Sequence, residues 1–284
     1  MSKIAIVTDT DASLPPDVAA EHDIRQVPML VHFGTQAYRS GLEIDDARLF
    51  ERIDREKKVP TTAAPAPGQF VEAFGAAFEA GASAVICYCI SRAMSASVEE
   101  ALAACDLLPG RDITIVDSQT VSMVQGFMVL AAAKAAQAGA PKAEILAHAK
   151  DVGDRGHLFA VLPTLKYLAM SGRVGQVAAG IANVLNVQPV LTVREGKLDL
   201  LERVRTRSRA WARMIELTLA GVGDRPVEQW ALVHVVAQAD ALELERLLRA
   251  RRPFPADRIV AELTPGLSVH SGAGLVGVAF VAGR

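Results

Sequence analysis

The chain has 284 residues, a formal net charge of −2 and an apolar fraction of 51%. This length suits one large domain or two of ordinary size, and the apolar fraction is ample for a core. The near-neutral charge excludes a protein whose overall field attracts nucleic acid or an anionic membrane. Cys87, Cys89 and Cys105 lack a CxxC spacing, so we expect buried free thiols rather than a metal or redox site.

The sequence lacks a targeting pattern and a membrane-spanning pattern. It begins with a strand-like segment, residues 4–7, without the basic and then apolar run of a signal peptide. The longest apolar runs, residues 128–136 and 177–185, are shorter than the ~20 residues that cross a bilayer. We therefore expect a cytoplasmic protein with no stable membrane anchor.

Strand and helix patterns alternate through the first half of the chain. Such alternation favours a mostly parallel sheet with helices on both faces. Residues 121–138 form a helical pattern that is nearly all apolar, and we expect this helix to be deeply buried. The predicted strands are residues 4–8, 24–32, 84–90 and 113–117, and the other predicted helices are residues 15–22, 47–57, 70–80, 95–105 and 142–154.

Gly156 starts a second group of elements, so we predict one domain at residues 1–156 and another at 157–284. The second group contains a hairpin around Glu195-Gly196 and several short strands, which favours a mixed sheet. The predicted fold class is therefore α/β, with two α/β domains. The predicted strands are residues 158–162, 187–194, 197–204, 230–236, 259–263 and 276–281, and the predicted helices are residues 176–185, 208–219 and 239–250.

Short hydroxyl residues and one histidine gather where these strands end. Ligands of open α/β sheets sit beyond the carboxyl ends of the strands. Neutral hydrogen-bond donors beside an apolar interior suit one buried carboxylate or phosphate better than a polar metabolite. The loops concerned are residues 9–13 (DTDAS), 59–68 with Thr61 and Thr62, 91–95 (SRAMS), 117–118 (DS) and 270–274 (HSGAG).

The order of these motifs resembles that of the DegV family. Residues 165–175, LKYLAMSGRVG, match the family pattern LxxLxxxGR(I/V)G, and residues 185–191, LNVQPVL, match LN(I/V)xP(I/V)L. A turn at Glu195-Gly196 and a basic run at residues 203–207 follow, as in the family. The five loops match in the same order: Asp9-Thr10 with D(S/T), residues 62–66 with TSQPS, 91–98 with SxxLSGTY, 117–118 with DS and 270–274 with HxGPG.

The resemblance implies a fatty-acid carrier with a ligand tunnel between its two domains. By transfer from the family, Thr62, Ser95 and His270 would hold the carboxylate of a long-chain fatty acid. The sequence departs from the family loops at Ala63, Ala64, Ala96 and Ala273, which makes these loops less polar. Residues expected to support the site or to lie near it are Asp9, Thr10, Thr61, Asp117, Ser118 and Gly272.

The resemblance also implies a protein without turnover of its own, and with no metal or cofactor. It would present the carboxylate to a separate ATP-dependent fatty acid kinase, which makes the acyl-phosphate. The basic residues Arg173, Arg203 and Arg205 would face that partner. The chain has no GxxxxGK[ST] loop with which to bind ATP itself.

Each of these residues also has a structural interpretation. Thr62 is a plausible turn residue in a proline-rich loop, and Ser95 is a natural N-cap for the helix that ends near Cys105. A lone histidine such as His270, between a strand and a glycine-rich turn, is more often structural. Asp9 and Asp117 would then order their loops. Three arginines, at 203, 205 and 207, would alternate along one strand and form a solvated face.

Two other functions fit parts of the sequence. A strand followed by Asp9 and Asp11 resembles the metal-dependent haloacid-dehalogenase phosphatases, but the later strands end without the acid pair that completes their metal site. A carrier of a different apolar acid is the second alternative. The glycines at 272, 274 and 277 fit a dinucleotide fingerprint, but too little chain follows for a βαβ unit, so we reject this interpretation.

Overall fold

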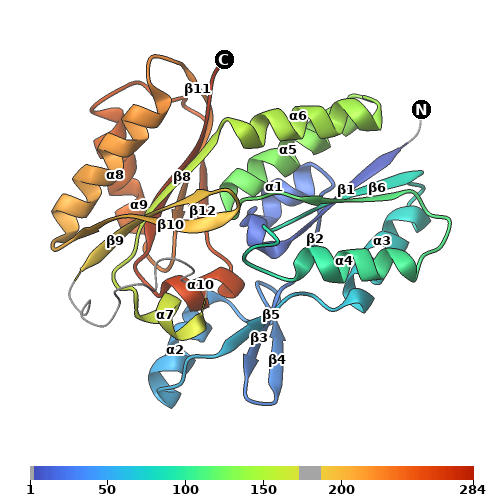
Figure 1. The fold of residues 1–284 in the computed structure, drawn as a ribbon, viewed down its shortest axis with the longest axis horizontal. Coiled ribbons are helices and arrows are strands. Elements are labelled where there is room, and N and C mark those ends of the chain that lie inside the picture. The colour runs from blue at the N-terminus through green and yellow to red at the C-terminus, as the bar shows by residue number, and fades with distance from the viewer. Residues whose placement is uncertain (1–2, 173–186) are drawn as a thin grey trace.

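The computed structural model describes residues 3–172 and 187–284. The predicted helix at residues 176–185 and the predicted partner residue Arg173 lie outside the described residues. In Figure 1 the parallel sheet of the first half lies on the right, the sheet of the second half lies on the left, and α2 with the small strands β3, β4 and β5 (residues 30–63) lies below them. Each half contains its own sheet, and α5 (Met123–Gln137) and α6 (Lys142–Asp154) lie along their junction.

The first sheet has four parallel strands in the order β2-β1-β6-β7. Side chains alternate between its faces, so Val7 and Cys87 pack beneath α3 and α4, while Ile6 and Ile86 join the core around α5. Cys87 and Cys89 are buried free thiols, as predicted, and Cys105 is half-buried. The elements are β1 (Ile4–Asp9), η1 (Thr10–Ala12), α1 (Pro16–Glu21), β2 (Arg25–Val27), α3 (Pro67–Glu79), β6 (Ala84–Cys89), α4 (Ser97–Asp106) and β7 (Ile113–Asp117).

The second sheet has six strands in the order β10-β9-β8-β13-β11-β12. Only β11 and β12 pair in parallel, and the other neighbours are antiparallel. The predicted fold class, with a parallel sheet followed by a mixed sheet, is therefore confirmed. The elements are β8 (Gly156–Val161), α7 (Lys166–Ser171), β9 (Gln188–Arg194), β10 (Lys197–Val204), α8 (Arg207–Val222), β11 (Val227–His234), α9 (Gln238–Arg249), β12 (Ile259–Glu262), α10 (Pro265–Ser271) and β13 (Val276–Ala282).

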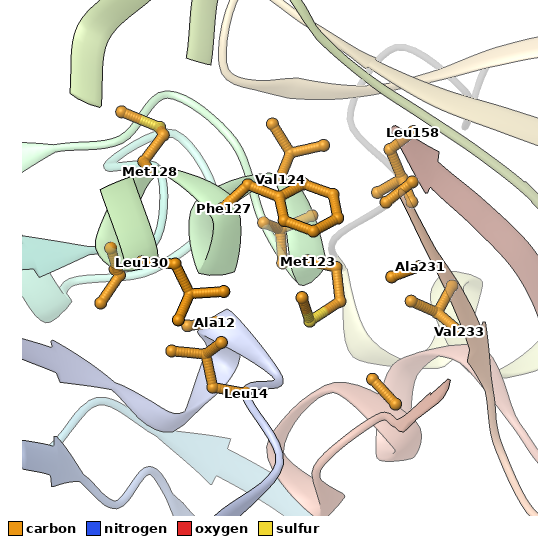
Figure 2. Close-up of a cluster of buried hydrophobic side chains, with 14 of the residues drawn as sticks. Ala12, Leu14, Met123, Val124, Phe127, Met128, Leu130, Leu158, Ala231 and Val233 are labelled. Carbon is orange, nitrogen blue, oxygen red and sulfur yellow. The ribbon is translucent and has the colours of Figure 1, made fainter. Parts of the chain in front are cut away.

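Helix α5 joins the cores of the two halves. Its residues from Met123 to Ala133 are all buried, because the helix is apolar on every side. Figure 2 shows Met123, Val124 and Phe127 of this helix among buried side chains that include Leu158 of the second sheet. α5 has only 15 residues, and among residues 3–172 and 187–284 no helix is long and apolar enough to cross a membrane.

A third, small sheet was not predicted. The sequence predicts one strand at residues 24–32, but the chain breaks at Pro28, which has no N–H group to continue a ladder. Residues before the break pair with β1, whereas residues after it pair in the order β4-β3-β5. Met29 bridges the break by donating its N–H to Thr10 Oγ1 at 3.0 Å. The elements are β3 (Leu30–Phe33), β4 (Gln36–Arg39), β5 (Thr61–Ala63) and the neighbouring helix α2 (Asp46–Glu56).

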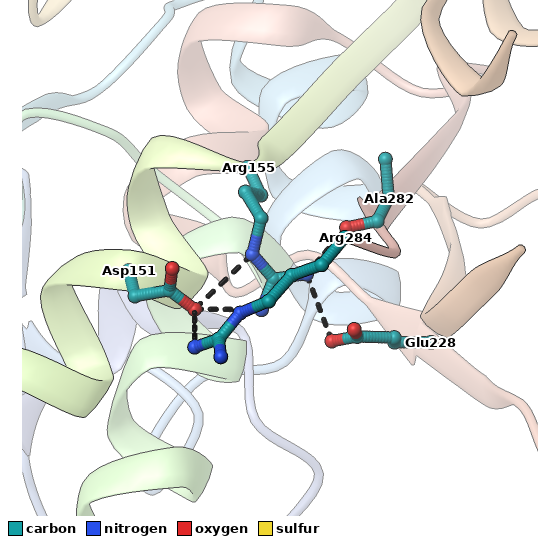
Figure 3. Close-up of polar contacts among 5 residues, drawn as sticks. All are labelled: Asp151, Arg155, Glu228, Ala282 and Arg284. Atoms are coloured by element: carbon teal, nitrogen blue, oxygen red, sulfur yellow. Dashed lines mark hydrogen bonds and ion pairs between the residues drawn. The ribbon is translucent and has the colours of Figure 1, made fainter. Parts of the chain in front are cut away.

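Arg155 forms ion pairs that connect the end of the first half of the chain to the second sheet. Its guanidinium group bonds to Asp151 Oδ2 of α6 at 2.8 Å and to Glu228 Oε2 of β11 at 2.8 Å. It also donates to the Ala282 carbonyl, and Arg284 contacts Asp151 at 3.1 Å (Figure 3). The side chain of Arg155 is only 15% exposed, so this junction is better shielded than a surface ion pair.

Candidate functional site

A cavity of about 390 Å³ lies between the two large sheets, a volume in the range of small-molecule sites. Its walls are mainly aliphatic and come from both halves of the chain. The polar side chains that line it are those of Asp11, Thr62, Ser95, Glu100, Ser122, Thr192, His270 and Ser271. The aliphatic lining residues include Met29, Ile90, Val121, Leu158, Leu162, Leu191, Leu198, Val233, Leu263 and Leu275.

Thr62 and His270 meet at the wall of this cavity, although they are 208 residues apart in sequence. Thr62 lies on β5, opposite Val31 of β3, and His270 lies in the last turn of α10, which contacts β5. Thr62 Oγ1 and His270 Nε2 are 2.9 Å apart, within hydrogen-bond distance. The donor of this bond depends on which ring nitrogen carries the proton. Both side chains are half-buried.

The position of His270 follows from helix α10, which the sequence analysis did not predict. Pro265 begins the helix, and the Ser268 hydroxyl donates to Asp46 Oδ2 of α2 at 2.6 Å. Gly272 ends it with φ +79, and a Cβ there would lie 2.5 Å from the ring of Tyr167. Only glycine satisfies both conditions. His270 is therefore a helical residue, and its predicted place between a strand and a turn is wrong.

Ser95 lines the same cavity from the loop before α4. Its predicted role as an N-cap is wrong, because α4 begins at Ser97 and Ala96 is the N-cap. The Ser91 carbonyl accepts the N–H groups of Met94 and Ser95, and this tight turn delays the start of the helix. Ser95 Oγ accepts the Ser97 N–H at 3.3 Å. The hydroxyl can still donate one hydrogen bond and accept another on the side of the cavity.

A hydrogen bond connects this loop to the second sheet. The Ser91 hydroxyl donates to the Gly196 carbonyl in the turn between β9 and β10, at 2.7 Å. This bond joins the loop that carries Ser95 to the hairpin that supplies Leu191 and Leu198 to the cavity wall. Thr62, Ser95 and His270 therefore line one cavity, and the less polar positions Ala63, Ala64 and Ala96 line it beside them.

Asp9 is fully buried beneath this region. Its carboxylate accepts hydrogen bonds from the Ile90 N–H at 2.8 Å, the Ser97 hydroxyl at 2.6 Å and the Gln125 amide at 3.0 Å. Burial raises the pKa of Asp9, and these three hydrogen bonds counteract that rise. Because protein groups occupy both of its oxygens, Asp9 is poorly placed to act as a nucleophile, and this geometry gives no support to the phosphatase alternative.

The other predicted supporting residues order strand ends rather than line the cavity. Thr10 accepts from Met29, Asp117 Oδ1 accepts the Gln119 N–H at 2.9 Å, and the Ser118 hydroxyl donates to the Thr120 carbonyl at 3.2 Å. Thr61 is exposed on β5. Within residues 3–172 and 187–284, no group of three His, Cys, Asp or Glu side chains could hold a metal ion.

The strand predicted at residues 197–204 is confirmed as β10, but it does not carry all three arginines. β10 ends at Val204, so Arg203 lies on the strand and Arg205 follows it, and both are exposed. Arg207 is instead the first residue of α8 and forms an ion pair with Asp240. The chain turns because Thr206 caps α8 by accepting the N–H group of Arg209. The three arginines therefore do not share one strand face.

Asp11 and Ser122 are cavity residues that the sequence analysis did not assign to the ligand site. Asp11 is 2% exposed and Ser122 is 3% exposed. Among the described residues, neither Asp11 Oδ1 nor Ser122 Oγ has a hydrogen-bond partner. Burial, and then the charge of Asp9, raise the pKa of Asp11 well above its ordinary value. The sequence signal for Asp11 is its place in the loop at residues 9–13, where it was named only as the second aspartate of the phosphatase alternative.

Comparisons with known proteins agree with this architecture. The model of a family described as "Uncharacterised protein, DegV family" matches residues 3–283. A DegV domain-containing protein of Streptomyces coelicolor is 34% identical over 275 residues, which cover 97% of this chain and 97% of that protein. The match therefore extends over both sheets and the cavity between them.

Two solved structures share the whole fold. A DegV family protein from Thermus thermophilus, described by its fatty acid binding, superposes with a TM-score of 0.91, 28% identity and 99% coverage of both chains. DegV from Bacillus subtilis, described as a fatty acid binding protein, gives a TM-score of 0.89 and 25% identity, and the match covers 99% of this chain and 100% of that one. Both descriptions name binding rather than a catalytic activity.

Proposed function

Because the chain belongs to the DegV family, we propose that it binds a long-chain fatty acid in the cavity between its two sheets. The observation that carries this proposal is the contact between Thr62 Oγ1 and His270 Nε2, at 2.9 Å, on the wall of a mainly aliphatic cavity. Ser95 lines the same cavity from the loop before α4. These three side chains would hold the carboxylate, and the aliphatic walls would enclose the acyl chain.

The physical chemistry of the cavity suits such a ligand. Burial of each methylene group is worth ~0.8 kcal/mol, so the acyl chain supplies most of the binding free energy. An ionised carboxylate cannot be buried without partners, and hydroxyl and imidazole donors form the stronger, charge-assisted hydrogen bonds to it. A carrier of another apolar acid would use the same groups, and only the identity of the bound molecule separates these two functions.

The two-domain division is part of this proposal. Every strand of the parallel sheet ends by Asp117, and every strand of the mixed sheet begins at Gly156 or later. A domain at residues 1–156 would therefore contain the parallel sheet and the small sheet, and a domain at residues 157–284 would contain the mixed sheet, with the ligand enclosed between the two domains. α5 belongs to the first domain in sequence but contributes side chains to both cores.

We further propose that the protein is a cytoplasmic carrier that presents the carboxylate to a separate ATP-dependent fatty acid kinase. The protein would need no metal or cofactor, and it would have no turnover alone. Arg203 and Arg205 are exposed near the end of β10, where they could meet an anionic phosphate donor or an acidic partner surface. Arg173 is proposed for the same role on the family resemblance.

Native mass spectrometry of the purified protein, followed by organic extraction, tests the proposed ligand. We expect a bound mass that extraction identifies as a long-chain fatty acid. A different apolar acid in the extract would favour the second carrier function. A protein that stays empty after incubation with an excess of fatty acid, while remaining folded, would contradict both.

A further inference from the structure

The cavity contains a second polar position, apart from the three proposed carboxylate partners. It consists of Asp11 and Ser122, whose side chains are 2% and 3% exposed and line the cavity. Their backbones are joined, because the Ser122 N–H donates to the Asp11 carbonyl at 2.8 Å. Among the described residues, Asp11 Oδ1 and Ser122 Oγ have no hydrogen-bond partner. We call these two residues the inner polar pair.

An unsubstituted acyl chain would leave the inner polar pair unsatisfied. A buried polar atom without a partner is costly, and native proteins pair nearly all such atoms. The neighbouring Asp9 shows the usual solution, since three protein donors surround its carboxylate. The Asp11 carboxyl group has one side-chain hydrogen-bond partner, Thr264, and its Oδ1 has none among the described residues. Burial raises the pKa of Asp11 well above the ordinary value, so Oδ1 is available as both donor and acceptor.

The position of Asp11 relative to the proposed head-group site follows from helix α10. Asp11 Oδ1 lies 2.9 Å from where a Cβ of Gly266 would be, so the carboxyl group packs directly against the helix backbone. Gly266 precedes His270 by four residues and therefore lies about one helical turn, ~6 Å, away on the same face. A ligand group that reaches Asp11 is consequently only a few carbon atoms from a carboxylate held at His270.

We infer that the cavity is built for a fatty acid that carries a hydroxyl group a few carbons from its carboxylate, and that Asp11 and Ser122 recognise this hydroxyl. A hydroxyl suits the pair because it can donate one hydrogen bond and accept another, and each member of the pair can do the same. The inference rests on the proposed function, since it presupposes that the carboxylate lies at Thr62, Ser95 and His270.

The inference predicts a specificity that the aliphatic walls alone cannot provide. A site built to pair with a ligand hydroxyl discriminates strongly against an analogue that lacks it, because its own polar groups stay unpaired. An aliphatic wall discriminates weakly between chains of equal length. Among acids of equal chain length, affinity should therefore depend on whether a hydroxyl is present and on its position along the chain.

The test is a titration of the delipidated full-length protein with three acids of equal chain length: palmitate, β-hydroxypalmitate and ω-hydroxypalmitate. We expect β-hydroxypalmitate to bind about ten- to a hundredfold more tightly than palmitate. The ω-hydroxy acid should gain no such advantage, because its hydroxyl lies at the far end of the chain. Equal affinities for palmitate and β-hydroxypalmitate would overturn the inference and leave the proposed function intact, whereas failure to bind all three acids would overturn the proposed function.

Variants of the inner polar pair assign the preference to these residues. Asp11→Ala and Ser122→Ala should each reduce the ratio of the two affinities toward one, whereas Asp11→Asn, which keeps a donor and an acceptor, should retain it. His270→Ala should weaken both acids by a similar factor and leave the ratio unchanged. A preference that persists in both Asp11→Ala and Ser122→Ala would overturn the assignment. The two alanine variants alter different segments of the chain. If one of them fails to fold, the affinity ratio of the other still tests the assignment.

Discussion

Asp9 and Asp11 stand two residues apart at the end of β1, yet their surroundings are opposite. Asp9 is enclosed by donors from Ile90, the residue after β6, and from α4 and α5, so the protein itself uses the hydrogen-bonding capacity of this carboxylate. Asp11 faces the cavity, as do Thr62, Ser95 and His270. The contrast teaches that neighbouring polar residues at one strand end can differ in the hydrogen-bonding capacity that the protein leaves unused, and on our proposal only the residues beside the cavity bind the ligand.

The largest effect should come from breaking the Asp9 network. In Asp9→Ala, the Gln125 amide would keep Thr8 Oγ1 as an acceptor. The buried Ile90 N–H and Ser97 hydroxyl would be left without their acceptor, at a cost of roughly 2–3 kcal/mol or more in the free energy of unfolding. Urea unfolding at neutral pH measures this loss. The half-buried Asp117 offers a control, since Asp117→Ala removes two backbone contacts but should cost only about 1 kcal/mol. A loss in Asp9→Ala no larger than in the control would refute the structural role of Asp9.

Substitutions in the cavity wall should lower ligand affinity more than they lower stability. Thr62→Val, Ser95→Ala and His270→Ala each remove a proposed hydrogen bond to a charged carboxylate, which is worth ~1.5–3 kcal/mol. We therefore expect fatty-acid affinity to fall about ten- to a hundredfold, with a smaller change in stability. Thr62→Ser keeps the hydroxyl and is the matched control in the same fluorescence titration. Unchanged affinity in Thr62→Val and His270→Ala together would mean that the carboxylate is held elsewhere.

Asp46 couples stability to pH beneath helix α10. Burial raises the pKa of Asp46 from 3.8 to about 7, and the charges of Glu262 and Asp45 add to the rise, while the hydrogen bond from Ser268 opposes it. A carboxyl group with a raised folded-state pKa stabilises the fold fully below its unfolded pKa and loses that contribution as the pH rises. Stability should therefore fall between pH 4 and pH 7, by at most ~1.4 kcal/mol per pH unit from this group.

Asp46→Asn is the test of this coupling, because the amide cannot ionise. Thermal unfolding across the same pH range should show a flatter profile for the variant than for the parent protein. Equal slopes in the two proteins would show that Asp46 does not titrate in this range. Since Ser268 of α10 bonds to Asp46, the same change reports on how firmly the helix that carries His270 is held.

The smallest effect concerns the exposed arginines. Charges at the edge of a docking surface mainly speed encounter and fix orientation, so Arg205→Ala should slow acyl-phosphate formation with the cognate kinase several-fold, and more strongly at low salt. Direct fatty-acid binding should be spared. Arg251, also exposed but at the end of α9, provides a matched control. An equal loss in binding and in kinase turnover would place Arg205 in the lipid site, and no loss in either would make it ordinary surface charge.

Much of the fold was predictable because its signals are local. The alternation of strand and helix patterns gave the two sheets, and the apolar run around Phe127 gave the buried helix α5. The strand ends that carry Asp9, Ser95 and Asp117 also followed from this periodicity. The local periodicity of apolar residues is enough to predict these elements, because each element buries one face, or all faces, against a neighbour.

The errors occur where distant segments decide the local structure. Pro28 is a local signal for a break, but the residues after it pair with the distant segment Thr61–Ala63. The helix that carries His270 is a short element held by Asp46 and Ser40. The start of α4 depends on a turn around Ser91. None of these contacts has a periodic signature in the sequence, so the motifs located the loops but not the conformation of each side chain.

A crystal structure of the protein with a bound long-chain fatty acid tests the central claim most directly. We predict a carboxylate oxygen within about 3.2 Å of Thr62 Oγ1 and another polar contact to Ser95 or His270, with the acyl chain between the walls formed by Leu158 and Leu263. A carboxylate held away from all three residues, or an acyl chain outside the cavity, would contradict it.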